Sequence, residues 1–211
     1  HVVDSNSSLR SAWGSLKQVP AIAESWVNFE RELSLIGVRG TNGEVVCYPL
    51  SENVHKEGIL RTTVAPYADT DLHDIAQNWL FSIMEKFDYR GVLTVEFFHT
   101  EQGLVANEMA PRVHNSGHWT IEGAETSQFE NHLRAVLGLP LGDTKPRGYA
   151  AMLNFIGNMP STTDALKISG AHLHDYCKKP RPNRKVGHLT LLANKREDLL
   201  KKITYVKDTL N

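Results

Sequence analysis

Cysteine is scarce in this sequence, and neither a long apolar run nor a surplus of one charge is present. Two cysteines among 211 residues cannot build a disulfide framework, so a reducing, cytoplasmic setting is expected. The 23 basic residues balance 24 acidic ones, which argues against nucleic acid or an anionic membrane as a partner. Uninterrupted apolar runs stay far below the ~20 residues that a membrane-spanning helix needs.

Several common motifs are also missing. The sequence has no GxxxxGK[ST] loop and no GxGxxG turn, so a nucleotide would have to be bound by another route. The chain starts with His1, and residues 1–10 contain no basic stretch followed by an apolar core, so they are not a signal peptide. We expect that the natural protein begins further upstream.

What is present is a globular composition arranged in short helices and strands. Apolar spacing predicts helices over residues 5–16, 70–87 and 127–137, and from residue 196 onward. Alternation predicts strands over residues 21–27, 32–38, 45–48, 59–64, 92–98, 104–109, 150–156, 171–175 and 186–192. Antiparallel hairpins dominate this order, and the alternation of helices and strands is irregular. The predicted class is therefore α+β rather than a doubly wound parallel sheet.

Three segments carry more specific expectations. The helix at 70–87 has a continuous apolar stripe, with Asp69 or Thr70 as its cap. In the helix at 127–137 the predicted apolar side consists of Phe129, Leu133, Val136 and Leu137. Residues 51–58 are expected to form a polar loop, and residues 138–148, rich in proline and glycine, are expected to form a linker.

The hairpin over residues 92–109 brings two acids together. If it turns about Gln102, Glu96 lies directly opposite Glu108. Opposed residues have Cβ atoms ~4.5–5.5 Å apart, where like charges repel, and neighbours on that face supply no basic partner. A divalent cation would relieve the repulsion, and two carboxylates with waters and phosphate suit magnesium. A solvated face, or a register shifted by one residue, remains open.

The run that follows, residues 107–119, concentrates chemistry in one loop. It holds an acid, a guanidinium, two imidazoles, amides and a hydroxyl directly after a strand, where binding groups gather in many proteins. His114 and His118 have a spacing that zinc could use, but no HExxH, CxxC or third clustered ligand accompanies them. We interpret the run as a binding loop.

Residues 178–185 are dense in cations and contain two prolines that stiffen the segment. A solvated basic loop is the simplest interpretation. A cluster of lysine and arginine in an otherwise neutral chain also suits a small phosphorylated ligand, and it is too short to grip a polynucleotide.

These stretches together resemble the N(5)-carboxyaminoimidazole ribonucleotide synthetases of the ATP-grasp superfamily. The resemblance is carried by EMAPRVHNSGHWT at 108–120 and SQFE at 127–130, with further matching stretches at 32–40, 48–50, 55–62, 91–98 and 181–189 in the family's order. It implies part of an ATP-grasp domain over residues 1–140 and a small β-rich domain over residues 146–211. The family's N-terminal domain and most of the first half of its grasp lie outside this chain.

The resemblance also implies an activity. It is the ATP-dependent carboxylation of 5-aminoimidazole ribonucleotide with bicarbonate, which gives ADP and phosphate, with ATP and Mg²⁺ as cofactors and a homodimer as the assembly. Because the family's nucleotide-binding lysines and glycine-rich lid are outside this chain, it is not expected to complete a catalytic cycle alone. Two alternatives stay open, a formate-dependent ribonucleotide transformylase and a catalytically incomplete binding or assembly module.

Roles for individual residues follow from the same resemblance. The implied adenine hinge is Glu24, Ser25, Trp26 and Val27, and further nucleotide contacts come from Glu32, His55, Asn107 and Glu108. The implied magnesium ligands are Glu96 and Glu108. Bicarbonate and the imidazole ring would be positioned by Arg112, His114, Asn115 and Ser116. The implied ligands of the substrate phosphate are Lys178, Arg181, Arg184 and Lys185.

Overall fold

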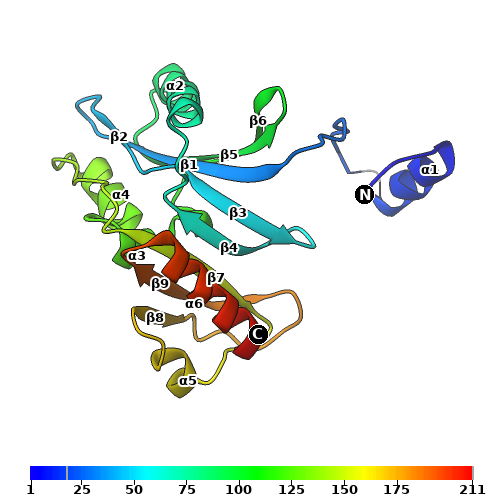
Figure 1. The fold of residues 1–211 in the computed structure, drawn as a ribbon. Coiled ribbons are helices and arrows are strands. Elements are labelled where there is room, and N and C mark those ends of the chain that lie inside the picture. The colour runs from blue at the N-terminus through cyan, green and yellow to red at the C-terminus, as the bar shows by residue number, and fades with distance from the viewer. Residues whose placement is uncertain (18, 211) are drawn as a thin grey trace.

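Antiparallel pairing joins the strands into a single sheet (Figure 1). In the computed structural model, which describes residues 1–17 and 19–210, the sheet has nine strands in the order β6-β5-β1-β3-β4-β7-β9-β8, with β2 paired to β1. The strands are β1 (Arg31–Arg39), β2 (Val45–Cys47), β3 (Ser51–Lys56), β4 (Ile59–Ala65), β5 (Gly91–Thr100), β6 (Gly103–Ala110), β7 (Tyr149–Ile156), β8 (Ala171–Asp175) and β9 (Lys185–Ala193). The α+β class with a dominant antiparallel sheet is confirmed.

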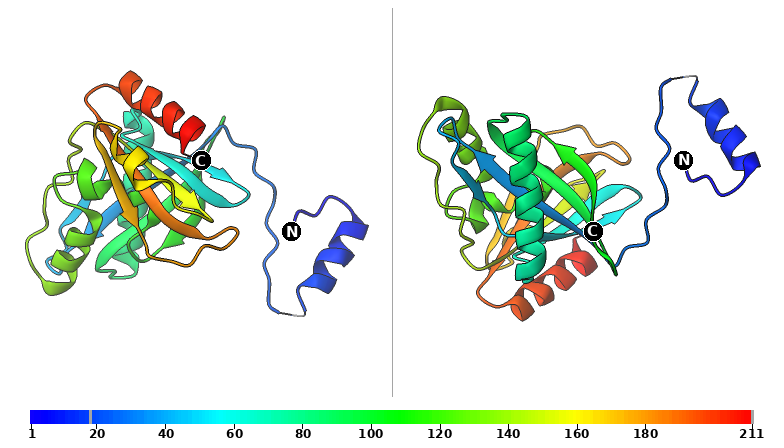
Figure 2. Two further views of the ribbon diagram at one scale, coloured as in Figure 1. Left: turned by 90° about the horizontal axis from the view of Figure 1, so that it is seen from below. Right: turned by 90° about the horizontal axis from the view of Figure 1, so that it is seen from above.

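Helices flank this sheet except for the first, which stands apart from it (Figure 2). They are α1 (Asn6–Ser15), α2 (Thr70–Lys86), the short 3₁₀ helix η1 (Asn115–Gly117), α3 (Thr120–Gly123), α4 (Gln128–Leu137), α5 (Thr162–Leu166) and α6 (Arg196–Thr209). Within residues 1–17 and 19–210, none of them has the length and apolar character that crossing a membrane requires.

The predicted helix at 70–87 is confirmed as α2. The Asp69 side chain accepts a hydrogen bond from the Leu72 backbone N–H at 3.0 Å, which satisfies one of the free donors of the first turn. Its apolar stripe is buried at Leu72, Ala76, Leu80 and Met84, against strands β1 and β5. A separate apolar core lies between α6 and strands β7 and β9.

Two segments of the sequence prediction are wrong. Residues 21–27 do not form a strand but run as an irregular segment between α1 and β1, and α1 stands apart from the sheet (Figure 1). Residues 51–56 are not a polar loop but strand β3, which pairs with β1 and β4. The polar residues Ser51 and Asn53 of β3 are buried because they bond to other buried polar groups, so their polarity did not indicate exposure.

The apolar side predicted for residues 127–137 is also wrong. The helix forms as α4, with Ser127 as its cap, but it buries Gln128, Asn131 and Ala135. Leu133, Val136 and Leu137 are exposed instead. Hydrogen bonds explain why the polar face of α4 is the buried one. The amide nitrogen and oxygen of Asn131 both bond to the backbone of Gly142. The amide of Gln128 bonds to the backbone of His114, in the loop after β6.

The connection over residues 138–148 packs against the body of the protein. Pro146 forms an isolated bridge with Ala124, and the Thr144 hydroxyl donates to the Cys47 carbonyl at 2.7 Å. On either side of this connection the sheet is continuous, since β4 pairs with β7 from Thr62↔Leu153 to Ala65↔Ala150.

Candidate nucleotide and metal site

The two glutamates of the β5–β6 hairpin lie opposite each other, as predicted. The register pairs Glu96 with Glu108, but two features combine to produce it. The turn pairs Thr100 with Gly103, which alone would offset the glutamates by one residue, and a bulge between Glu96 and Phe97 restores the pairing. Bulges commonly re-aim side chains beside functional sites, and here one turns both carboxylates to the same place.

The environment of Glu96 suits a cation. Its side chain is only 13% exposed, and burial raises its pKa, with a further upward contribution from Glu108 that His55 opposes. Glu108 is exposed at the edge of the sheet. Among the described residues, no three or more His, Cys, Asp or Glu side chains lie together in a group that could hold a metal ion. Two carboxylates fit magnesium, which retains waters and takes phosphate oxygens as its other ligands.

Glu32 and His55 meet beside this pair. The Glu32 carboxylate lies 3.0 Å from His55 Nδ1, and both side chains are about one-fifth exposed. They come from adjacent strands, β1 and β3, so the sheet brings together two residues that the resemblance placed on the nucleotide.

The segment that leads into β1 borders a cleft of about 630 Å³. The lining residues are Trp26, Val27, Asn28, Phe29, Glu30, Thr100, Glu101, Gln102 and Val105. Phe29 stacks on Phe98 with ring centroids 4.5 Å apart and an interplanar angle of 12°. The predicted hinge residues Trp26 and Val27 therefore line a cleft, whereas Glu24 and Ser25 are outside its lining. Sequence reasoning missed the stacking of Phe29, two residues before β1, on Phe98 of β5.

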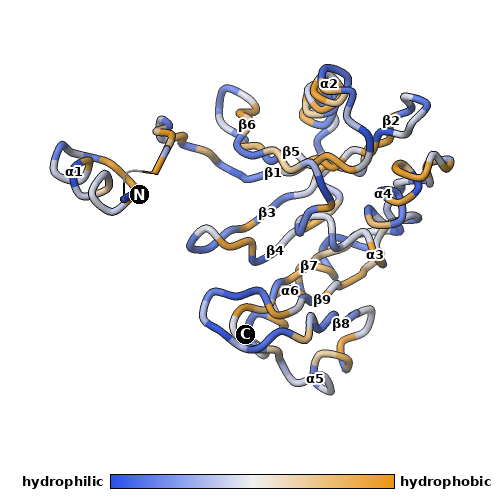
Figure 3. Tube along the Cα trace, turned by 180° about the vertical axis from the view of Figure 1, so that it is seen from behind, coloured by the Kyte–Doolittle hydropathy of each residue, from blue (hydrophilic) through white to orange (hydrophobic). Residues whose placement is uncertain are grey.

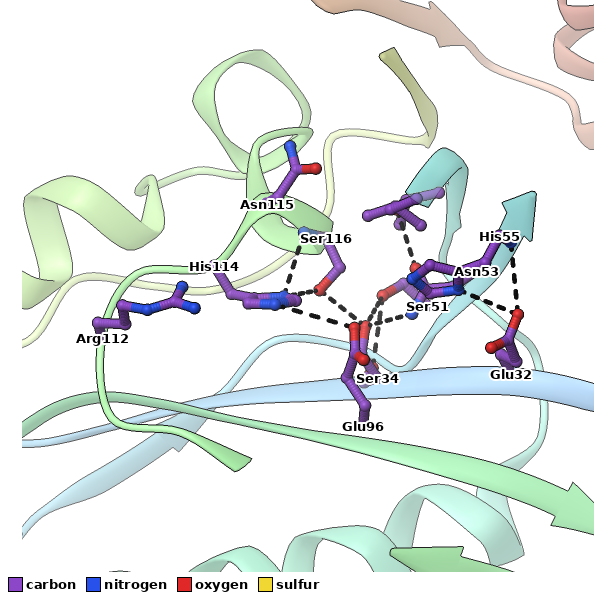
Figure 4. A network of polar contacts seen from close by, with 12 residues as sticks. Glu32, Ser34, Ser51, Asn53, His55, Glu96, Arg112, His114, Asn115 and Ser116 are labelled. Carbon is purple, nitrogen blue, oxygen red and sulfur yellow. Dashed lines mark hydrogen bonds and ion pairs between the residues drawn. The ribbon is translucent and has the colours of Figure 1, made fainter. Parts of the chain in front are cut away.

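The loop after β6 folds back over Glu96 (Figure 4). His114 Nε2 lies 3.9 Å from the Glu96 carboxylate, and His114 Nδ1 lies 2.8 Å from the Ser116 hydroxyl. Burial lowers the pKa of His114 to about 4, and the neighbouring positive charge of Arg112 contributes to this lowering, so the imidazole is neutral near pH 7. Gln128 holds the loop in place by accepting from the His114 N–H at 3.0 Å and donating to the His114 carbonyl at 2.7 Å.

Asn115 joins this loop to strand β7. Its amide exchanges two hydrogen bonds with the amide of Asn154, at 3.1 and 2.7 Å. Sequence reasoning missed Asn154, although an asparagine within an apolar strand such as YAAMLNFI indicates a buried polar contact.

A histidine cluster continues from this contact. His118 Nδ1 lies 3.1 Å from the Tyr176 hydroxyl, which lies 2.8 Å from His188 Nδ1. His188 stacks on His174 at 4.3 Å. Burial lowers the pKa of His118 to about 4 and that of His188 to about 3. Tyr176, His174 and His188 were not predicted as site residues.

The cationic segment forms the connection between β8 and β9, a hydrophilic stretch in Figure 3. Lys185 is half-buried, and burial lowers its pKa while the nearby charge of Glu96 raises it. Lys178 lies over the Tyr176 ring at 4.9 Å. Arg181 is exposed, and Arg184 is half-buried. The fold thus brings Lys185 within electrostatic reach of Glu96.

Comparison with known proteins shows which family the chain belongs to. A family model of the ATP-grasp domain matches residues 1–129. The chain belongs to the ATP-grasp family. A second family model, described as the phosphoribosylaminoimidazole carboxylase C-terminal domain, matches residues 150–202 of this ATP-grasp protein.

Individual relatives agree with both matches. The N5-carboxyaminoimidazole ribonucleotide synthase of Pseudomonas aeruginosa is 49% identical over 199 residues, which cover 94% of this chain and 55% of the relative. The crystal structure of N5-carboxyaminoimidazole ribonucleotide synthetase from Thermus thermophilus has a TM-score of 0.96 and 51% identity, covering 100% of this chain and 59% of that one.

A third relative was solved with ligands. The N5-carboxyaminoimidazole synthase of Aspergillus clavatus, in complex with ADP and 5-aminoimidazole ribonucleotide, has a TM-score of 0.91 and 36% identity, covering 99% of this chain and 59% of that one. The resemblance identified from the sequence is confirmed. The chain spans about half the length of the curated relatives it matches.

Proposed function

We propose that this chain forms the metal-binding and substrate-positioning part of an ATP-dependent carboxylase acting on 5-aminoimidazole ribonucleotide. The products are N5-carboxyaminoimidazole ribonucleotide, ADP and phosphate. The observation that carries the proposal is the pairing of Glu96 with Glu108 directly beneath a loop that presents Arg112 and His114. Relatives with the same fold include one solved with ADP and the aminoimidazole ribonucleotide.

Glu96 and Glu108 would hold Mg²⁺, which when bound neutralises phosphate charge and aligns the transferred group. The cleft beside Phe29 and Phe98 would take the adenine, with Trp26 and Val27 on its wall and Glu24 and Ser25 preceding it. The ribose hydroxyls would bind to Glu32. His55 and Asn107 would contact the rest of the nucleotide.

The loop residues would handle the small substrates. Arg112 would stabilise the charge of the carboxyl group that is transferred. His114, Asn115 and Ser116 would position bicarbonate and the imidazole ring. The His114 side chain is only 12% exposed, and a site that burial shields in this way would protect an activated carboxyl group from hydrolysis.

The 5′-phosphate of the ribonucleotide would bind the β8–β9 connection through Lys178, Arg181, Arg184 and Lys185. We further propose that residues 1–140 and 146–211 act as two functional units of one homodimeric enzyme. The first carries the nucleotide and metal, and the second carries the substrate phosphate.

The direct test is phosphate release from ATP and bicarbonate, with and without 5-aminoimidazole ribonucleotide. It compares this chain with a version extended at the N-terminus to the length of its relatives. Glu108→Gln in the extended version should abolish substrate-stimulated release, because the neutral amide lacks the negative charge with which the carboxylate holds magnesium. Glu85→Gln, on the outer surface of α2, is the matched control and should keep full activity. Normal turnover in Glu108→Gln would overturn the metal assignment. No stimulation in the extended protein would favour a binding or assembly module.

The phosphate assignment has a separate test. Replacing Arg184 and Lys185 with alanine should raise the KM for the ribonucleotide at least about tenfold, since a hydrogen bond to a charged group contributes roughly 1.5–3 kcal/mol. The KM for ATP should change little. Lys201→Ala, on the exposed side of α6, is the control. An equal rise in both KM values would contradict a phosphate site at this connection.

A further inference from the structure

A chain of buried hydroxyl and amide groups leads from the interior of the sheet to His114 (Figure 4). Its members are Thr63, Asn53, Ser34 and Ser116, contributed by β4, β3, β1 and η1. All four are buried, each at most 4% exposed. The sequence predicted none of the contacts among these four residues, and it placed only Ser116 at the site.

Each contact in this chain is a hydrogen bond of ordinary length. The Thr63 hydroxyl donates to Asn53 Oδ1 at 2.9 Å, and Asn53 Nδ2 donates to the Ser34 hydroxyl at 3.0 Å. The Ser34 hydroxyl donates to the Ser116 hydroxyl at 3.0 Å. The Ser116 hydroxyl lies 2.8 Å from His114 Nδ1.

The geometry of the contacts gives the donors one direction from the asparagine onward, since Asn53 Nδ2 donates to Ser34 and Ser34 donates to Ser116. An amide nitrogen can only donate, so the Ser34 oxygen accepts from Asn53 and has one hydrogen left to give. The Ser116 oxygen receives that hydrogen, which leaves its own hydrogen for His114 Nδ1. Ser51, 2.9 Å from the Ser34 oxygen, fits the same order as a second donor to it.

A second donor points to the same nitrogen. The backbone N–H of Ser116 donates to His114 Nδ1 at 3.3 Å. Because a backbone N–H cannot accept, this long contact adds to the preference for a lone pair on Nδ1, with the ring proton of the neutral imidazole on Nε2. Nε2 is the nitrogen that faces Glu96 and the proposed substrate site, at 3.9 Å from the carboxylate.

We propose that Asn53 and Ser34 are positioning residues which, through Ser116, fix His114 as the Nε2–H tautomer. His114 then offers the site a hydrogen-bond donor rather than a base. Such a donor fits an anionic or carbonyl oxygen, like those of a carboxyl group in transfer. The role of this donor toward a transferred carboxyl group rests on the proposed function, whereas the assignment of the tautomer does not.

The tautomer can be read without substrate. Long-range ¹H–¹⁵N correlation spectra of this chain at neutral pH distinguish a protonated from an unprotonated ring nitrogen, and the signals missing in His114→Gln identify this residue. The expected spectrum has an unprotonated Nδ1 and a protonated Nε2. A protonated Nδ1 in the unsubstituted chain overturns the proposal.

Variants test whether the buried chain sets this state. Asn53→Asp keeps the shape but replaces the donor to Ser34 with an acceptor, which reverses the hydroxyls of Ser34 and Ser116, so the His114 nitrogen signals should shift toward the Nδ1–H pattern. Ser34→Ala interrupts the chain, and the two signals should move toward each other as the tautomers mix. If Asn53→Asp does not fold, the spectrum of Ser34→Ala alone tests whether the buried chain sets the His114 tautomer.

Thr94→Val is the matched control, since Thr94 is fully buried on β5 and its hydroxyl makes no hydrogen bond within the described residues. It should leave the His114 signals unchanged. Unchanged signals in folded Ser34→Ala would overturn the proposal. In the extended enzyme, Ser34→Ala should lower kcat while the KM for ATP stays constant. An extended enzyme that is inactive, but whose spectrum shows Nε2–H, would contradict the proposed function and leave the tautomer assignment standing.

Discussion

Helices α2 and α4 lie on the same sheet but are held to it by different forces. Helix α2 buries Leu72, Ala76, Leu80 and Met84, so it is held by the removal of apolar surface from water. Helix α4 buries Gln128 and Asn131 and leaves Leu133 58% exposed, so it is held largely by directional hydrogen bonds. An apolar contact tolerates small shifts, whereas an amide bonded through both ends fixes a position. Helix α4, which lies next to the candidate site, is therefore the helix whose position is fixed by hydrogen bonds.

The largest effect should come from the apolar side of this comparison. Leu80→Ala on α2 should lower the free energy of unfolding by about 3 kcal/mol, because it leaves a cavity at a fully buried position. Leu133→Ala on α4 removes the same atoms at an exposed position and should change stability by less than about 0.5 kcal/mol. Urea unfolding of both variants measures the difference. Equal losses would show that the two helices are anchored alike.

At the polar contact of α4, we expect a smaller loss of overall stability than for Leu80→Ala but a larger change in local opening at His114. Gln128→Ala leaves the N–H and the carbonyl of His114 without their partners, which should cost about 2 kcal/mol. Amide hydrogen exchange at His114 should accelerate more than exchange in β1 or β5. If exchange rises uniformly over the chain, Gln128 contributes only to general stability and does not position the loop.

Acid should weaken the buried histidine cluster around His188. The pKa of His188 is about 3 in the folded protein against ~6.5 in the unfolded chain, so the unfolded chain binds its proton more readily. The contribution of the neutral His188 to the free energy of unfolding is therefore complete above pH ~6.5. It is lost as the pH falls toward 3, by at most about 1.4 kcal/mol per pH unit. His188→Gln should flatten the pH dependence of the unfolding free energy in this window. The control His172→Gln, at an exposed position of β8, should not.

The comparison of α2 and α4 also explains which parts of the structure could be predicted from the sequence. Apolar periodicity reports burial only where apolar residues do the packing, so it located α2 and failed for the faces of α4. It failed for β3 as well, where Ser51 and Asn53 are buried because both bond to the Ser34 hydroxyl.

The candidate site shows the same limit. The opposition of Glu96 and Glu108 was predictable from hairpin geometry, although a turn and a bulge that cancel each other produced it. Ser34, Asn53 and Asn154 could not be assigned, because their partners are far away in sequence and only the folded sheet brings them together. The family resemblance supplied candidate site residues where spacing alone left alternatives open, and their roles stay predictions.

The unbroken run of strand pairing from β4 into β7 has a consequence for building hybrid proteins. The parts matched by the two family models, residues 1–129 and 150–202, share backbone hydrogen bonds from Thr62↔Leu153 to Ala65↔Ala150. A chimera that takes each part from a different relative must therefore preserve the strand register at this seam as well as the length of the connection over residues 138–148. A one-residue slip there would turn the inward side chains of β7, Asn154 among them, to the opposite face of the sheet.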